Sequence, residues 1–279
     1  MRWSEGELTG LGGVGLYRQA WLPEDEARAV VVLAHGLSEH SGRYAYVGAR
    51  LAAEGYALQA LDHRGHGRSD GPRSYFDAIE DLVADLDQLV LVLATADPGL
   101  PLFLLGHSMG GLVAAEYAIR HQERLAGLLL SAPLAALEAA SPLTRIAAAA
   151  LSQLMPRRGL IAIDSSQVSR DPEVVRAYRA DPLVYHGKLP ARTVSALASA
   201  IASLPERVAA VKLPTAIMYG SADRLAPPAG SLMLHSRIGA ADKTLTAYDG
   251  LYHEILNEPE RDQVLGDMCA WLRKHGDGG

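Results

Sequence analysis

The stretch Gly106-His107-Ser108-Met109-Gly110 follows a short apolar run, residues 102–105, and precedes a segment in which apolar residues recur at helical spacing. A Gly-x-Ser-x-Gly string between a strand and a helix predicts a nucleophile elbow, a turn so tight that its serine takes a strained backbone conformation. Gly106 and Gly110 meet the need for residues without bulk on either side of that turn. The stretch predicts acyl transfer through an ester of Ser108, and the alternative is a glycine-rich turn that matches by chance.

Short apolar runs alternate along the chain with segments of helical spacing. The candidate strands are residues 30–34, 56–61, 102–105, 125–130, 215–219 and 244–248, and the candidate helices include 76–93 and 257–273. Uninterrupted apolar strands that alternate with helices are typical of a parallel sheet with both faces covered. We therefore expect an α/β fold with a mostly parallel central sheet and helices on both faces.

Residues 134–205 break this alternation. The stretch is rich in alanine, leucine and proline and contains no convincing strand. Apolar residues recur at helical spacing over 143–155 and again over 194–204. We interpret 134–205 as a helical cap inserted into a core made of 1–133 and 206–279. Crossover helices of the sheet are the alternative, but the stretch is long for one crossover.

A serine hydroxyl needs a general base, and the base needs an orienting acid. In this type of fold the chain order is serine, acid, histidine. Asp223 follows the apolar run 215–219, and His253 lies in the loop after the run 244–248. Because the carboxyl ends of parallel strands meet at one edge of the sheet, we expect Ser108, Asp223 and His253 to converge there as the catalytic residues.

Two other histidines and one other aspartate compete for these roles. His235 lies in a helical stretch and His275 lies near the glycine-rich end of the chain, so neither is placed in the loop after the last strand. Asp249 is close in sequence to the predicted base, but beside Gly250 it is typical of a turn residue. We therefore favour Asp223 as the acid.

The oxyanion hole needs a second backbone donor from the loop after an early strand. The string His35-Gly36-Leu37 follows the run 30–34 and fits that place. We expect the amides of Leu37 and Met109 to bind the oxyanion together, with the leucine side chain incidental. Loss of one such donor typically lowers turnover by ~10²–10³. His35 is expected to be a structural hydrogen-bonding residue.

The segment 62–69, Asp-His-Arg-Gly-His-Gly-Arg-Ser, is rich in histidine and arginine. It offers no obvious third or fourth metal ligand, and its glycines do not form a phosphate-binding pattern. We expect a structural loop beneath the active site. The chain is expected to need no cofactor, either metal or organic.

The composition describes an ordinary globular chain. It has 279 residues, of which 49% are hydrophobic and 21% charged, with a formal net charge of −6. A net acidic chain without a basic cluster makes nucleic acid an improbable partner. The single cysteine, Cys269, excludes an internal disulfide, and its apolar helical surroundings predict a buried thiol. The oligomeric state stays unknown.

No targeting signal is evident. The N-terminus has no apolar signal core, and no apolar run approaches the length of a membrane span. We expect a cytoplasmic location, with peripheral contact with lipid left open. The apolar stripe of residues 143–155 predicts a lid that meets micelles or membranes transiently, although one face of that helix must pack on the core.

Five strings, residues 35–44, 62–69, 106–111, 220–224 and 248–253, together resemble the monoacylglycerol lipase and lysophospholipase type of α/β-hydrolase. They span nearly the whole chain, and the string Glu-His-Ser-Gly-Arg-Tyr within the first of them is the most specific. The resemblance implies cleavage of monoacylglycerols to a free fatty acid and glycerol. It also implies a cap that presents an apolar face to lipid.

The resemblance implies further site residues. Glu39 and Arg43 match positions that help to build the polar end of the pocket, and Tyr178 matches a tyrosine that points toward the glycerol side. The alternatives are an ion pair of Glu39 and Arg43 that holds the oxyanion loop, and a Tyr178 that packs within the cap. The string that follows the predicted base, residues 254–260, resembles bacterial members of the family more than mammalian ones. A second histidine that some relatives place three residues after the base is Leu256 here.

Several functions stay open at this point. A broad carboxylesterase, a lysophospholipase and a thioesterase use the same residues, and a ligand receptor can keep a full triad with little turnover. Dehalogenases and epoxide hydrolases of this fold use a carboxylate nucleophile, so Ser108 argues against them. The pocket strings contain no extra basic cluster for a phosphate, which mildly favours a neutral glyceride over a lysophospholipid.

Overall fold

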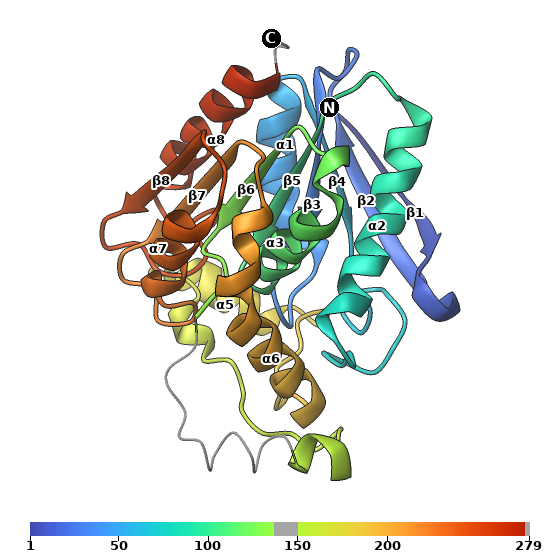
Figure 1. Cartoon of the computed structure of the whole chain (residues 1–279), viewed down its shortest axis with the longest axis vertical. Helices are drawn as coiled ribbons and strands as arrows, with labels where there is room; N and C mark the ends of the chain where they lie inside the picture. Colours follow the sequence, from blue (N-terminus) through green and yellow to red (C-terminus); the bar gives the residue numbers. More distant parts are fainter. Residues whose placement is uncertain (137–149, 277–279) are drawn as a thin grey trace.

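The computed structural model of the protein describes residues 1–136 and 150–276. An eight-stranded sheet runs through them in the order β1-β2-β4-β3-β5-β6-β7-β8 (Figure 1). The strands are β1 (Arg2–Thr9), β2 (Gly15–Leu22), β3 (Ala29–Ala34), β4 (Tyr56–Leu61), β5 (Leu102–His107), β6 (Gly127–Ser131), β7 (Thr215–Gly220) and β8 (Lys243–Tyr248). Neighbouring strands from β4 to β8 are parallel. The prediction of a mostly parallel α/β sheet is confirmed.

Helices cover both faces of this sheet. They are α1 (Ala45–Ala53), α2 (Ile79–Ala96), α3 (Met109–His121), α5 (Pro172–Ala180), α6 (Ala191–Arg207), α7 (Pro228–Arg237) and α8 (Arg261–Gly276). Alternate residues of the strands point to opposite faces, so Val30 and Val32 of β3 pack with α2, α3, α6 and α7. Val31 and Leu33 pack instead with α1 and α8. Two buried clusters, one on each face, therefore hold the sheet rigid.

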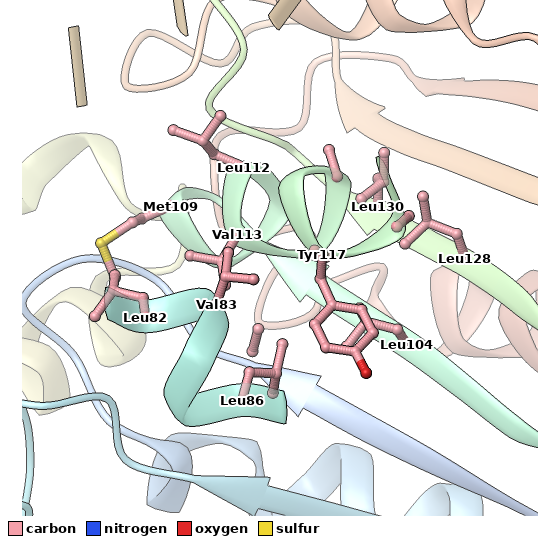
Figure 2. Packing of buried hydrophobic residues seen from close by; sticks show 14 of the residues in the cluster. Leu82, Val83, Leu86, Leu104, Met109, Leu112, Val113, Tyr117, Leu128 and Leu130 are labelled. Carbon is pink, nitrogen blue, oxygen red and sulfur yellow. The ribbon is translucent and has the colours of Figure 1, made fainter. Parts of the chain in front are cut away.

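The packing of α2 against α3 positions the predicted elbow. Figure 2 shows Leu82 and Leu86 of α2 close to Val113 and Tyr117 of α3, beside Leu104 of β5. These side chains are fully buried. Burial of one such apolar side chain stabilises the fold by roughly 1.5–3 kcal/mol. The first turn of α3 is therefore held in place directly after β5.

The two N-terminal strands form the part of the sheet that the apolar runs of the sequence do not predict. β1 pairs antiparallel with β2, and β2 pairs antiparallel with β4. Most of β1 is exposed, and its sequence is largely polar, because an edge strand contributes few side chains to the core. The apolar-run signal that identifies central strands is consequently absent there.

Two helix starts differ from their predictions. The helix expected from residue 76 begins at Ile79, because Phe76 packs into the core from the preceding loop. The Asp81 carboxylate accepts a hydrogen bond from the Ala78 amide at 3.2 Å, which caps that start. The closing helix begins at Arg261 rather than at residue 257. Pro259 stands just before it and favours a helix start at that point.

The described part of the predicted cap contains residues 150–154 in helical conformation, α5 and α6. In Figure 1 these elements lie beyond one end of the sheet. Leu197, Ile201 and Leu204 of α6 join the cluster that contains α2 and α3, so α6 also rests on the core. Residues 143–149, which begin the predicted apolar stripe, lie outside the described residues.

Two simpler expectations concern burial and membrane spanning. Cys269 on α8 is buried and free, as predicted. Across residues 1–136 and 150–276, no helix combines the length and the apolar character needed to cross a bilayer.

Candidate active site

Ser108 stands at the turn between β5 and α3. Its φ of 55° and ψ of −120° lie in a region that non-glycine residues rarely adopt. A Cβ added at Gly106 would overlap the Gly110 carbonyl oxygen, and one added at Gly110 would overlap the Ala34 carbonyl oxygen. Only glycines allow β3, β5 and α3 to approach so closely. The turn therefore presents the strained serine at the end of the sheet.

Asp223 and His253 lie in the loops after β7 and β8. His253 Nδ1 and Asp223 Oδ2 are 2.7 Å apart. The other carboxylate oxygen of Asp223 accepts hydrogen bonds from the amides of Leu225 and Ala226, at 2.8 and 2.9 Å. These bonds orient the carboxylate toward the imidazole. Ser108 and His253 line the same cavity, so the three residues expected at this edge come together.

The competing aspartate lies elsewhere. Asp249 is exposed and accepts a hydrogen bond from the Ser221 hydroxyl at 3.1 Å, in the turn where Ser221 also accepts one from the Gly250 amide. This is the turn arrangement expected of an aspartate beside glycine.

The environment of His253 favours its protonated form. Burial lowers the pKa of His253, but the charge and hydrogen bond of Asp223 oppose burial, and the pKa is raised above its usual value. The His107 ring lies 4.8 Å from the His253 ring. Burial and the neighbouring His253 lower the pKa of His107 to about 4, so His107 stays neutral. With Nδ1–H donated to Asp223, the free nitrogen of His253 is Nε2.

The loop after β3 lies directly against the serine. A Cβ added at Gly36 would be 3.3 Å from the Ser108 Cβ. His35 Nδ1–H donates to the Gly36 carbonyl oxygen at 2.8 Å, and His35 Nε2 accepts from the His63 amide at 2.9 Å. His35 therefore ties this loop to the segment 62–69. Leu37, which follows Gly36 in the loop, lines the same cavity as Ser108.

The Met109 amide is the second predicted oxyanion donor. Met109 is the first residue of α3, where backbone N–H groups have no intrahelical acceptor. The N-terminal end of the helix also carries a partial positive charge. An oxyanion formed on the Ser108 side of the cavity would meet both features.

Glu39 and Arg43 lie in a buried network with Glu254, which we call the carboxylate–arginine network. Arg43 Nη1 donates to Glu39 at 2.6 Å, and the guanidinium donates to both oxygens of Glu254 at 2.6 and 2.7 Å. Glu39 Oε1 accepts from the Gly36 amide at 2.6 Å and from the Tyr44 hydroxyl at 2.7 Å. The network contains the ion pair that was the alternative to direct substrate binding by Glu39 and Arg43. Glu39 and Glu254 also line the cavity.

Tyr178 reaches the same region from α5. It is buried and lines the cavity, and the Arg43 guanidinium carbon lies 4.7 Å from the centre of its ring. Such a contact over an aromatic face is attractive. Tyr178 thus connects the described part of the predicted cap to the carboxylate–arginine network.

The cavity has a volume of about 330 Å³, within the range of small-molecule sites. Most of its polar residues gather around the serine: Glu39, His107, Ser108, His253 and Glu254. Asp164 is the exception, because it lines the cavity from an exposed position in the segment before α5. Its apolar walls come mainly from the region after β6 and from the loop after β7, and they include Leu134, Ile161, Ile163, Val168, Leu197 and Leu225. The cavity is therefore polar at the serine and mostly apolar away from it.

The segment 62–69 contacts the chain that follows β3. Asp62 Oδ1 accepts from both the amide and the hydroxyl of Ser41, at 2.8 and 2.6 Å, and Oδ2 accepts from the Arg68 amide at 2.8 Å. These bonds fasten the chain between β3 and α1 to the segment. Within the described residues, no group of three or more histidine, cysteine or acidic side chains is placed to hold a metal ion.

Glu254 is a residue at this site for which the sequence alone indicates no role. The available signal was an acidic residue next to the predicted base and followed by the apolar pair Ile255-Leu256. That signal does not identify Arg43 as its partner, because the two residues are 211 positions apart in the chain.

Comparisons with known proteins agree with this architecture. The family model Hydrolase_4, described as serine aminopeptidase, S33, matches residues 25–260. A monoacylglycerol lipase of Mycolicibacterium smegmatis is 44% identical over 98% of both chains. The human monoglyceride lipase is 34% identical over 95% of this chain and 89% of its own.

Solved structures give the same picture. The monoacylglycerol lipase of Paleococcus ferrophilus superposes with a TM-score of 0.84 at 30% identity, covering 93% of this chain and 99% of the other. A soluble variant of the Saccharomyces cerevisiae monoglyceride lipase, in complex with a substrate analogue, gives a TM-score of 0.86 at 27% identity over 97% and 94%. The chain therefore belongs to the Hydrolase_4 family and is a serine hydrolase of the α/β-hydrolase fold.

Proposed function

We propose that the protein hydrolyses monoacylglycerols to a free fatty acid and glycerol through an acyl-enzyme on Ser108. The observation that carries the proposal is the cavity, which is polar at Ser108 and mostly apolar away from it. A substrate with a small polar head and one long acyl chain matches that division. The similarity to monoacylglycerol lipases over nearly the whole chain supports the same substrate.

Acylation uses the three residues that meet at the sheet edge. His253 Nε2 takes the proton of the Ser108 hydroxyl while Asp223 holds Nδ1, and the serine oxygen attacks the ester carbonyl. The amides of Leu37 and Met109 stabilise the oxyanion. His253 then donates its proton to the glycerol oxygen, and the carbon–oxygen bond to glycerol breaks.

Deacylation repeats the same steps with water. His253 takes a proton from water, and the resulting hydroxide attacks the acyl-enzyme carbonyl. The tetrahedral intermediate collapses, Ser108 regains its proton from His253, and the fatty acid leaves. No step requires a metal or an organic cofactor, because base, acid and oxyanion donors all come from this chain.

Recognition of the two substrate parts is assigned to opposite ends of the cavity. The acyl chain lies along the apolar walls, and the glycerol hydroxyls meet the polar end, where Glu39 and Tyr178 line the cavity. Arg43 contributes by holding Glu39 and by its contact with the Tyr178 ring. In this proposal residues 134–205 form the cap and 1–133 with 206–279 form the hydrolase core.

Contact with lipid is assigned to the cap. Leu154, Met155 and Ile161 lie in this region and are exposed, with Leu154 at 81%. Exposed apolar side chains of this kind near the entrance of a lipid pocket favour transient docking on micelles or membranes. This contact needs no membrane-spanning segment.

The decisive experiment compares initial rates on mono-, di- and triacylglycerols of several chain lengths, a lysophospholipid and a short nitrophenyl ester. We expect the highest kcat/KM on monoacylglycerols. We also expect Ser108→Ala to lower kcat by at least about a thousandfold on every ester while folding normally. Equal or higher kcat/KM on the lysophospholipid, or a flat profile over all esters, would replace the proposal by a lysophospholipase or a broad carboxylesterase. Stoichiometric acylation without turnover would indicate a receptor-like protein.

A further inference from the structure

Glu254 is held from several sides directly after the proposed catalytic base. Its side chain is 6% exposed, and both of its oxygens accept hydrogen bonds from the Arg43 guanidinium. The Asn257 side chain also donates from Nδ2 to Glu254 Oε2 at 2.9 Å, and the Glu254 backbone N–H donates to the Val168 carbonyl oxygen at 2.8 Å. The conformation of the loop that carries His253 is therefore tied to the position of Arg43.

The same guanidinium holds the other side of the site. Arg43 donates to Glu39, and Glu39 accepts the amide of Gly36, the residue before the proposed oxyanion donor Leu37. Charge-assisted hydrogen bonds of this kind are short and strongly directional. A continuous series of them joins the histidine loop to the oxyanion loop through Glu254, Arg43 and Glu39.

The charges in this network do not balance. Two buried carboxylates, Glu39 and Glu254, share one guanidinium, so the network carries an excess negative charge. Burial raises the pKa of Glu39, but Arg43 and neighbouring histidines lower it to about 2, so Glu39 is ionised. An unbalanced buried charge is costly to maintain, which indicates a use beyond stability.

His253 is the group that faces this excess charge. The titratable groups around it are Asp223 from the loop after β7, His107 at the end of β5, Glu254 beside it, and Glu39 within the network whose cation is Arg43. The charges of Asp223, Glu254 and Glu39 all favour the imidazolium. His107 is kept neutral by burial and opposes it little.

We propose that Glu254 is a positioning residue for the reaction: through Arg43 it aligns the histidine loop with the oxyanion loop, and its charge stabilises the imidazolium that His253 becomes in the transition state. This inference rests on the proposed function. It adds to the Asp223–His253 pair a second anion that acts on His253 through its charge. It also makes Arg43 a link between the proton-transfer and oxyanion halves of the site.

The test is Glu254→Gln, which keeps the shape and one acceptor for Arg43 but removes the charge. We expect kcat on monoacylglycerols and on a short soluble ester to fall by roughly 10–100-fold, with KM changed by less than about threefold. Removal of a nearby negative charge lowers the pKa of His253. The acid limb of the kcat/KM profile should therefore move to lower pH by roughly 0.5–1 unit.

A matched control is available on α3. Glu116 is fully buried and does not line the cavity. Its carboxylate accepts hydrogen bonds from Nη1 and Nη2 of Arg207 at 2.9 and 2.7 Å, and a further one from Arg120. Glu116→Gln removes a comparable buried charge. We expect it to lower thermal stability while kcat and the acid limb remain those of the wild type. This variant separates the general cost of breaking a buried ion pair from an effect on His253.

Arg43→Lys tests the link independently. Lysine keeps the positive charge but lacks the planar fork that reaches two carboxylates. We expect kcat to fall by at least about tenfold while the acid limb moves by less than about 0.3 unit, because the charges around His253 are unchanged. If the Glu254→Gln variant does not fold, the Arg43→Lys variant tests the inference in its place. Full activity of the Arg43→Lys variant would overturn the inference.

The remaining outcomes are also decisive. A folded Glu254→Gln enzyme with wild-type kcat and an unmoved acid limb would overturn the inference, and so would a fall in kcat with the limb unmoved. Failure of the proposed function has a different signature. In that case the wild-type and Glu116→Gln enzymes themselves would not turn over monoacylglycerols, or a phosphonate ester would not label Ser108.

Discussion

At the residue scale, the backbone geometry of Ser108 depends on Gly106 and Gly110, which have no side chains. A serine with positive φ costs of order 1–3 kcal/mol, and it persists only where the surrounding structure over-determines it. Here β5 and the buried face of α3 supply that constraint. The close approach of three backbone segments at Gly106 and Gly110 leaves no space for a methyl group.

Gly110→Ala should therefore damage both stability and activity. The added methyl group overlaps the Ala34 carbonyl oxygen and lies 2.6 Å from that of His35, so the oxyanion loop must shift. We expect the free energy of unfolding to fall by roughly 1–3 kcal/mol and kcat by at least about a hundredfold. Urea unfolding and ester hydrolysis measure these effects. The control is Gly99→Ala, whose methyl group meets nothing within 4 Å. Equal unfolding free energies and equal kcat values of the two variants would refute the packing argument.

At the element scale, α8 contains an avoidable weakness. Gly266 lies inside this helix, and a Cβ there meets nothing within 4 Å. Alanine loses less backbone entropy than glycine on entering a helix, so Gly266→Ala should raise the free energy of unfolding by about 0.5–1 kcal/mol without changing activity. Chemical denaturation measures it. Gly127→Ala is the contrasting variant, because its methyl group would lie 2.7 Å from the Trp271 ring. If Gly266→Ala lowered the free energy of unfolding, that result would contradict the argument.

The cap region gives a second prediction at this scale. Leu154 and Met155 are 81% and 50% exposed and do not line the cavity, so their replacement by serine removes little buried surface. We expect the double variant to bind micelles less tightly and to lose activity on long-chain substrates, while hydrolysis of a short soluble ester is unchanged. Leu232→Ser on α7, where the leucine is 51% exposed, is the matched control. Unaltered micelle binding in the double variant would assign lipid contact to another surface.

At the scale of the whole molecule, a buried group of histidines couples folding to pH. The rings of His63 and His66 lie 4.5 and 5.5 Å from that of His35. Burial lowers the pKa of all three, that of His66 to about 3. The unfolded chain binds protons at these residues below about pH 6.5, whereas the folded chain does not. The stability they contribute is complete above that pH and is lost as the pH falls toward the folded values.

His63→Leu should weaken this pH dependence. In the described part of the chain neither ring nitrogen of His63 has a hydrogen-bond partner, so an apolar side chain of similar size removes a titrating group at little cost. We expect the decline in the free energy of unfolding between about pH 6.5 and 5 to become shallower by up to about 1.4 kcal/mol per pH unit. Urea unfolding at several pH values measures the slope. An unchanged slope would show that His63 does not contribute to acid sensitivity.

Local patterns in the sequence were enough to predict the central strands, the elbow at Ser108 and the order in which an acid and a histidine follow it. These features depend on neighbours in the chain: an apolar run forms a buried strand, and a glycine pair permits a tight turn. Parallel strands end at a common edge of the sheet. The order of the loops along the chain was therefore also enough to predict that Asp223 and His253 lie close together. Edge strand β1 escaped prediction because an exposed strand leaves little hydrophobic signal.

The tertiary structure alone decided what surrounds these residues. Arg43 and Glu254 are 211 positions apart, and no local pattern pairs them. Their contact exists because the oxyanion loop and the histidine loop leave different strands at the same edge of the sheet. The excess negative charge beside His253 likewise depends on burial and distance, which strengthen electrostatic interactions only once the chain has folded and excluded water. The amino-acid sequence determined which groups the proposed reaction uses, and the packing of distant segments decided the electrostatic environment around them.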